Sequence, residues 1–114
     1  MPYLKIQTNH SVSPEKSNAL LSLASKKLAN ELGKPERYVM VELTANPSML
    51  FGGSGEPAAY LELKSIGLPC DQTKSLSKNL SSLLVENLGI SPSRIYIEFT
   101  DVKGNLWGWN GSTF

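Results

Sequence analysis

The two halves of this chain of 114 residues resemble each other, and no other feature of the sequence constrains its fold as strongly. Tyr3-Leu4-Lys5-Ile6 matches Tyr60-Leu61-Glu62-Leu63, and Val39-Met40-Val41-Glu42 matches Ile95-Tyr96-Ile97-Glu98. Between each pair of matching stretches, a run with helical spacing ends in Leu-Gly. The offset between the halves stays at about half the length of the chain, which indicates the duplication of one supersecondary unit.

The first half predicts a strand, a helix and a second strand. Residues 2–8 alternate between two faces, as a strand does. Ser13 is a suitable N-cap, Pro14 suits the first helical position, and Gly33 ends a run with apolar residues at helical spacing. Residues 38–45 are rich in β-branched and apolar side chains, which favours a strand with covered faces over a strand at the edge of a sheet.

The second half repeats this order. Residues 58–66 are typical of a strand, and Asp71 is a suitable cap for a second helix that ends at Gly89. Residues 94–100 predict the fourth strand, and a short strand at 106–109 follows a turn. The second half therefore adds one more strand, helix and strand, with a short extension behind them.

The duplicated unit predicts the fold class. A strand, a helix and a strand in one sheet form a right-handed parallel crossover. Two such units predict an α/β (α+β) fold, namely a four-stranded mixed sheet with two antiparallel helices on one face, plus short extra strands. The other face has no helix to cover it, although we assign apolar strand residues to it: Val39, Val41, Leu61, Leu63, Ile95 and Ile97. Such a face requires another layer. We therefore expect one domain over residues 1–114, with pseudo-repeats at roughly 2–45 and 58–101. We also expect this domain to associate with further copies in a closed ring.

Composition argues against several classes of function. The net charge is +1 and the Lys and Arg residues are scattered, so nothing predicts binding to nucleic acid or to an anionic membrane surface. Cys70 is the only cysteine and His10 the only histidine, which excludes an internal disulfide and argues against a metal site or a catalytic histidine. The sequence has neither a long apolar run nor the features of a signal peptide, so the expected location is the cytoplasm.

The N-terminus offers a candidate general base. Initiator methionine is usually removed when the second residue is small, as Pro2 is. Removal of Met1 would leave Pro2 with a free secondary amine instead of an amide. The strand that follows would fix the position of this amine, and burial would lower its pKa by disfavouring the ammonium form. While Met1 is retained, the nitrogen of Pro2 is an amide and is not a base. The plainer interpretation is that Met-Pro is a common way for a protein to begin.

Other candidate residues are individually weak. Lys34 follows the glycine that ends the first helix, where a lysine either complements the helix dipole or binds a substrate carboxylate. Trp109 and Phe114 lie in a glycine-rich tail and fit an interface or the rim of a pocket better than a core. The loop FGGSGEP at 51–57 lacks the residues of a phosphate-binding loop, so we interpret it as a tight turn.

Several stretches are specific in combination: Met1-Pro2, Thr8-Asn9, LGKP at 32–35 with Tyr38, FGGSGEP at 51–57, SIG at 65–67, ISPSRIYI at 90–97 and GWNGSTF at 108–114. With this set, the whole chain resembles the macrophage migration inhibitory factor (MIF) family of the tautomerase superfamily. The resemblance implies a duplicated βαβ fold that assembles as a homotrimer, with sites at the subunit boundaries. It also implies keto–enol tautomerisation of phenylpyruvate-like or dopachrome-type compounds without a metal or any other cofactor.

The resemblance assigns roles to particular residues. Pro2, once freed, is the base that takes and returns a proton next to a carbonyl. Lys34 would bind the carboxylate of a small aromatic 2-keto acid or its enol, and Ile66 would supply backbone and apolar contacts. Tyr96 from the adjacent subunit would line the pocket and help to keep the amine unprotonated. The aromatic rim would consist of Tyr38, Trp109 and Phe114.

Three positions depart from the family. Glu98 stands where animal members have a substrate-contacting asparagine, and its carboxylate would repel an anionic substrate. Trp107 replaces a small aliphatic residue at the mouth of the pocket. The Cys-x-x-Cys pair of the family falls at residues 58–61, which read Ala-Ala-Tyr-Leu, so thiol–disulfide chemistry by that motif is not expected; Cys70 lies elsewhere.

Two functions therefore stay open from the sequence. The first is a tautomerase that uses Pro2. The second is a cytokine-like signalling or binding protein with a vestigial or weak pocket, whose receptor the sequence does not identify. By family resemblance, the second function would involve non-classical secretion from the cytoplasm.

Overall fold

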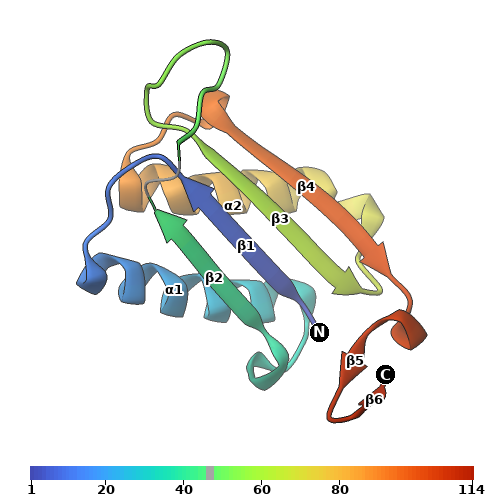
Figure 1. Cartoon of the computed structure of the whole chain (residues 1–114). Coiled ribbons are helices and arrows are strands. Elements are labelled where there is room, and N and C mark those ends of the chain that lie inside the picture. Colours follow the sequence, from blue (N-terminus) through green and yellow to red (C-terminus); the bar gives the residue numbers. More distant parts are fainter. Residues whose placement is uncertain (46–47) are drawn as a thin grey trace.

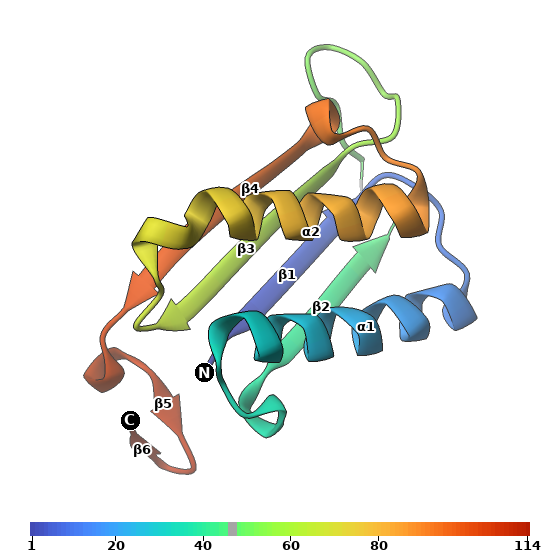
Figure 2. The ribbon, with the colours of Figure 1, turned by 180° about the vertical axis from the view of Figure 1, so that it is seen from behind.

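The structure, a computed structural model, describes residues 1–45 and 48–114. Its main sheet has the strand order β2-β1-β3-β4, formed by Met40–Ala45, Tyr3–Thr8, Ala59–Ile66 and Ile95–Val102. β1 is parallel to β2 and antiparallel to β3, and β3 is parallel to β4. α1 (Pro14–Leu32) and α2 (Thr73–Leu88) lie side by side on one face of the sheet (Figures 1 and 2). The predicted mixed sheet with two helices is confirmed.

The first helix begins and ends as predicted. The side chain of Ser13 accepts a hydrogen bond from the backbone nitrogen of Lys16 at 3.2 Å, and Pro14 occupies the first turn. Gly33 ends the helix with φ of 62°, a left-handed conformation that glycine adopts without strain. α2 differs, because Asp71 lies in a 3-10 turn ahead of it and Gln72 precedes the helix without a side-chain cap. The predicted cap at Asp71 is therefore wrong.

β2 lies at the edge of the sheet, so the prediction of a covered strand is wrong for this segment. Its apolar content reflects one covered face only. Val41 and Leu43 pack against the core, whereas Met40 is 65% exposed. At the C-terminus, β5 (Gly108–Trp109) and β6 (Ser112–Thr113) pair with each other as a small antiparallel hairpin.

The apolar core lies between the sheet and the two helices. Leu4, Ile6, Leu61 and Leu63 point from the sheet into it and are fully buried. The prediction that apolar residues cover the other face is wrong. Side chains alternate along a strand, and these apolar strand residues all lie on the face that the helices cover. The residues that pack in or against this core are Val39, Val41, Leu61, Leu63, Ile95 and Ile97.

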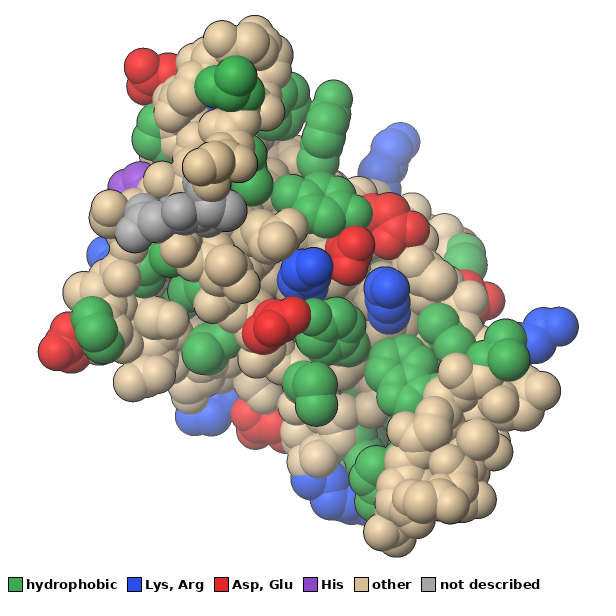
Figure 3. Space-filling view, in the orientation of Figure 1, with side chains coloured by type: hydrophobic (Ala, Val, Ile, Leu, Met, Phe, Trp, Pro, Cys, Tyr) green, Lys and Arg blue, Asp and Glu red, His purple; other side chains and the backbone are tan. Residues whose placement is uncertain are grey.

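The uncovered face of the sheet is charged. The residues that alternate with the core positions form a row across four strands by register, in the order Glu42, Lys5, Glu62 and Glu98. Figure 3 views this face and shows Lys, Arg, Asp and Glu side chains of both signs beside hydrophobic side chains. The apolar strand residues therefore give no reason to expect a further apolar layer on this face.

Within the described ranges, neither helix combines the length and the apolar character that crossing a membrane requires.

Candidate functional site

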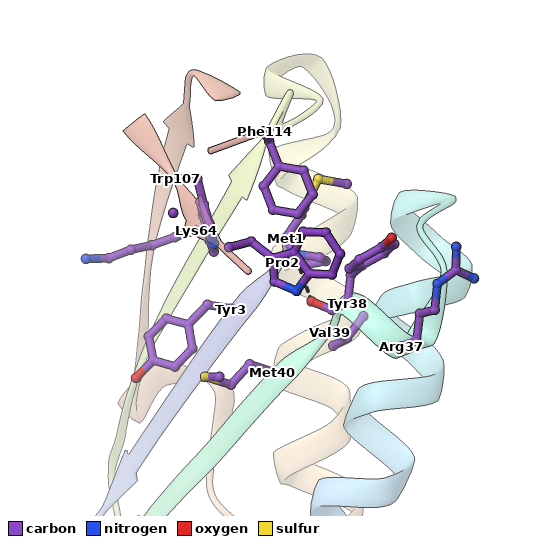
Figure 4. A pocket seen from close by; sticks show the side chains of 12 residues that line it. Met1, Pro2, Tyr3, Arg37, Tyr38, Val39, Met40, Lys64, Trp107 and Phe114 are labelled. Carbon is purple, nitrogen blue, oxygen red and sulfur yellow. Dashed lines mark hydrogen bonds between the residues drawn. The ribbon is translucent and has the colours of Figure 1, made fainter. Parts of the chain in front are cut away.

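A cavity of about 400 Å³ opens at the end of the sheet where β1 begins. Four segments meet there, which are the N-terminus, the 3-10 turn Glu36–Tyr38 with the start of β2, the end of β3, and the C-terminal tail. Figure 1 shows both chain termini at this end of the molecule. The lining residues, most of which are labelled in Figure 4, are Met1, Pro2, Tyr3, Arg37, Tyr38, Val39, Met40, Lys64, Trp107, Gly108, Trp109 and Phe114.

Pro2 is fully buried at this cavity, and its backbone is fixed on both sides. Its carbonyl accepts a hydrogen bond from the backbone nitrogen of Met40 at 3.0 Å, and Tyr3 already belongs to β1. The amine of Met1 donates to the carbonyl oxygen of Tyr38 at 2.5 Å, a contact drawn as a dashed line in Figure 4. The start of the chain therefore has a defined position between β1 and β2.

The electrostatic surroundings favour an unprotonated amine at this place. The pKa of the Met1 amine lies below its ordinary value, mainly because burial disfavours the ammonium form and also because the positive charge of Lys34 is near. Lys34 does not line the cavity directly. Its Nζ donates a hydrogen bond to the carbonyl oxygen of Ile66 at 3.0 Å, which holds the lysine between the end of α1 and the end of β3.

The aromatic residues form one cluster at the rim. The ring of Tyr38 meets Trp109 edge-on with centroids 5.4 Å apart, and it meets Phe114 edge-on at 5.9 Å. Trp109 and Phe114 stack on each other at 5.4 Å. Edge-on and stacked pairs of this kind are favourable arrangements for aromatic rings. The C-terminal tail is thereby attached to the 3-10 turn that follows Lys34.

Two of the expected site residues lie elsewhere in the chain. Tyr96 is near the start of β4, at the opposite end of the sheet from Pro2, where its ring lies 4.6 Å from that of Phe51. Glu98 accepts a hydrogen bond from Thr100, at 2.9 Å to one carboxylate oxygen and 3.0 Å to the other, and points to the uncovered face. One chain by itself therefore does not bring these two residues to the cavity at Pro2.

Six lining residues were not predicted as site residues from the sequence: Tyr3, Arg37, Val39, Met40, Lys64 and Gly108. Strand periodicity could have indicated two of them, Lys64 and Tyr3. Lys64 shares a strand face with Ile66, and the register pairs it directly with Tyr3. In Figure 4 the long side chains of Arg37 and Lys64 extend away from Pro2 on opposite sides, so their charges lie at the rim of the cavity.

Among residues 1–45 and 48–114, no group of three or more His, Cys, Asp and Glu side chains is placed to hold a metal ion.

Comparison with known proteins identifies relatives over the full length of the chain. The sequence profile of the family described as macrophage migration inhibitory factor (MIF) matches residues 1–114. A MIF homologue from Brugia malayi is 42% identical, with 100% of this chain and 99% of the relative covered, and MIF from Meriones unguiculatus gives the same values. The crystal structure of a MIF homologue from Prochlorococcus marinus is 46% identical, covers 98% of each chain and superimposes with a TM-score of 0.93. The chain belongs to the macrophage migration inhibitory factor family.

Proposed function

We propose that the chain, once Met1 is removed, is a keto–enol tautomerase for phenylpyruvate-type or dopachrome-type compounds with the amine of Pro2 as general base. The observation that carries the proposal is the complete burial of Pro2 against a cavity of about 400 Å³. A cavity of this size is in the range of small-molecule sites in proteins.

The amine of Pro2 would act in its neutral form. It takes a proton from the carbon next to the keto group while the carbonyl oxygen gains a proton, and the reverse steps return the keto form. The causes that lower the pKa of the Met1 amine are burial and the charge of Lys34. Pro2 is the more deeply buried of the two residues, so we expect burial to lower the pKa of its free amine as well. A base whose pKa lies near the working pH is the most effective in proton transfer.

The remaining residues would bind and orient the substrate. Lys34 supplies a cation for the carboxylate of a small aromatic 2-keto acid, and the backbone of Ile66 fixes the position of that cation. The aromatic cluster of Tyr38, Trp109 and Phe114 supplies an apolar wall for the substrate ring. These roles need no cofactor, because the base and the charge recognition both come from side chains and the N-terminus.

The complete site would form in a homotrimer. Tyr96 is 64% exposed and lies at the other end of the sheet, so it reaches a Pro2 cavity only if that cavity belongs to another copy. We assign Tyr96 and Glu98 to the cavity of the adjacent subunit in a closed ring. In a ring closed by head-to-tail contacts, every subunit makes the same two contacts with its neighbours.

The substitution Pro2→Gly tests the role of the base. Glycine also permits removal of Met1, so the variant keeps a free N-terminus but loses the secondary amine and the rigid ring. We expect phenylpyruvate tautomerisation to fall by about 100-fold or more, in the range that general base catalysis contributes. Pro14→Ala in the first turn of α1, far from the cavity, is the matched control and should keep full activity.

The same variant separates enzymatic from signalling function. Receptor binding by a cytokine-like protein would survive Pro2→Gly, whereas tautomerase activity would not. If Pro2→Gly retains most of the tautomerase activity of the processed protein, the general-base proposal is wrong.

A further inference from the structure

We propose that Arg94 is a positioning residue for the active site of the neighbouring subunit, because it holds Tyr96 against a clamped loop. The inference rests on the proposed function, since it requires that Tyr96 acts in the cavity of a second copy. The clamped loop, defined here as residues 49–58, lies at the end of the sheet opposite Pro2. Arg94 acts on the reaction only through this loop and Tyr96.

The guanidinium of Arg94 donates four hydrogen bonds, each to a main-chain carbonyl group of the loop. Its Nε donates to Pro57 at 3.1 Å, and its Nη1 donates to Phe51 at 3.0 Å. Its Nη2 donates to Ser54 at 3.1 Å and to Glu56 at 3.0 Å. Charge-assisted hydrogen bonds are stronger than neutral ones, and the planar fork of arginine holds several acceptors in one geometry.

Asn9 ties the same loop from the end of β1. Its Nδ2 lies within hydrogen-bond distance of three loop carbonyls, at 3.5 Å from Met49, 3.2 Å from Gly55 and 3.1 Å from Glu56. Its Oδ1 accepts a hydrogen bond from the backbone nitrogen of Ala58 at 2.8 Å. The loop is therefore fixed from two directions, by the residue after β1 and by the turn before β4.

This clamp has a direct consequence for Tyr96. The guanidinium carbon of Arg94 lies 5.2 Å from the ring centroid of Phe51, and the ring of Phe51 lies 4.6 Å from that of Tyr96. Arg94 therefore contacts Phe51, and Phe51 in turn contacts Tyr96. An exposed tyrosine on an open sheet face normally samples several rotamers, and ordering it on binding costs free energy. A fixed Phe51 reduces this cost by ordering Tyr96 before assembly.

The position of Tyr96 in the sheet is consistent with action in another copy of the chain. By register, Tyr3 pairs with Lys64 and Lys64 pairs with Thr100. Tyr96 therefore lies about 13 Å from this row of residues, toward the start of β4. Leu50 of the clamped loop is 73% exposed beside a hollow of about 380 Å³ that Tyr96 also lines. An exposed apolar end and an open cavity at opposite ends of one chain suit a head-to-tail contact between copies.

The conservative variant Arg94→Lys tests the fork geometry. Lysine keeps the charge but presents at most three rotatable donors, which do not reproduce the planar fork. With processed protein and phenylpyruvate, we expect KM to rise by about fivefold or more while kcat on the plateau of the pH profile stays unchanged, because Pro2 and Lys34 are untouched. Ser93→Ala, in the same turn, is the matched control and should leave KM unchanged. An unchanged KM in Arg94→Lys would overturn the proposal.

Mixed assembly is the decisive experiment, because it separates action on the neighbour from a role within the same subunit. Two chains, Arg94→Gln and Pro2→Gly, are co-expressed with different affinity tags, and assemblies that carry both tags are isolated. A site built from the cavity of the Arg94→Gln chain and the Tyr96 of the Pro2→Gly chain is complete. In a closed ring of three chains, every assembly that carries both tags contains one such site, so we expect about one third of the wild-type sites to be restored.

The outcomes are distinct. Activity well above the sum of the two parents supports the proposal, whereas activity no higher than that sum overturns it, because Arg94 would then act within its own subunit. If Arg94→Gln does not fold, Phe51→Leu takes its place, since it removes the ring that holds Tyr96 and keeps the Arg94 hydrogen bonds to the backbone. Substantial activity of Pro2→Gly alone would instead contradict the proposed function, independently of Arg94.

Discussion

The ammonium group of Lys34 donates a hydrogen bond to the carbonyl oxygen of Ile66 at 3.0 Å, and this contact joins the end of α1 to the end of β3. It places a fixed positive charge close to the start of the chain, where that charge helps to lower the pKa of the terminal amine. One residue would thus serve two purposes in the proposed reaction. It would bind the carboxylate of the substrate, and it would keep the base unprotonated.

The first prediction concerns substrate binding by this charge. Replacement of Lys34 by methionine should raise KM for phenylpyruvate by about tenfold or more, the loss expected for a hydrogen bond between charged groups. The methyl ester of phenylpyruvate has no carboxylate charge, so its KM should change much less. Lys26→Met on the exposed side of α1 is the control for the loss of one positive charge. Equal effects on the acid and the ester would contradict the assignment.

The second prediction concerns pH. The neutral amine is the active form, so kcat/KM should rise with pH and level off above the pKa of the Pro2 amine. Because burial and Lys34 lower the pKa of the terminal amine, the plateau should begin below the pH expected for an ordinary amine. Lys34→Met removes one of these two causes, so the rising limb should move to higher pH. A pH–rate profile of both proteins with the ester substrate measures this shift, and a shift to lower pH would contradict the account.

The third prediction concerns Glu98. Its side chain is exposed, and the residue paired with it by register is Glu62, which carries the same charge. If Glu98 borders the cavity of the adjacent subunit, Glu98→Asn should raise kcat/KM for phenylpyruvate by about two- to fivefold at low ionic strength, and less at high salt. Glu86→Gln on α2 is the control. A loss of activity in Glu98→Asn would show instead that the carboxylate has a positive role.

The fourth prediction concerns the C-terminal tail. A Cβ atom on Gly104 would lie 3.0 Å from the carbonyl oxygen of Phe114, too close for an ordinary contact with backbone. Gly104→Ala should therefore displace Phe114, disturb its stacking on Trp109 and raise KM by about two- to fivefold with little change in kcat. Tryptophan fluorescence reports the displacement. Asn105→Ala in the same turn is the control, and an unaltered fluorescence spectrum in Gly104→Ala would contradict the expected displacement.

The sequence predicts most of the fold because local signals agree with one another. Ser13, Pro14 and Gly33 mark both ends of α1, and the duplicated strands determine the mixed sheet. The errors arise where the partner of a residue is decided by tertiary structure. The helices cover the face that carries Leu61 and Leu63, so the apolar strand residues belong to the core and the uncovered face is charged. The number of apolar strand residues by itself predicts an apolar uncovered face, whereas their alternation along each strand places them in the core.

The sequence predicts the site only in part, for a similar reason. Lys34 and Ile66 are 32 positions apart, and only the tertiary fold brings the residue that follows α1 to the end of β3. Tyr3 and Lys64 become neighbours through the strand register, which the sequence alone does not state. The four hydrogen bonds from Arg94 end on main-chain carbonyls, which are present at every residue, so no sequence pattern points to them.

The most direct test of the central claim is the rate of phenylpyruvate tautomerisation before and after removal of Met1 from the same protein preparation. Intact mass establishes the state of the N-terminus, and an aminopeptidase removes the methionine. We predict that activity appears in proportion to the fraction of chains with a free Pro2, because only that form has an amine at the fully buried position. Equal activity before and after removal of Met1 would contradict the role of Pro2 as the base.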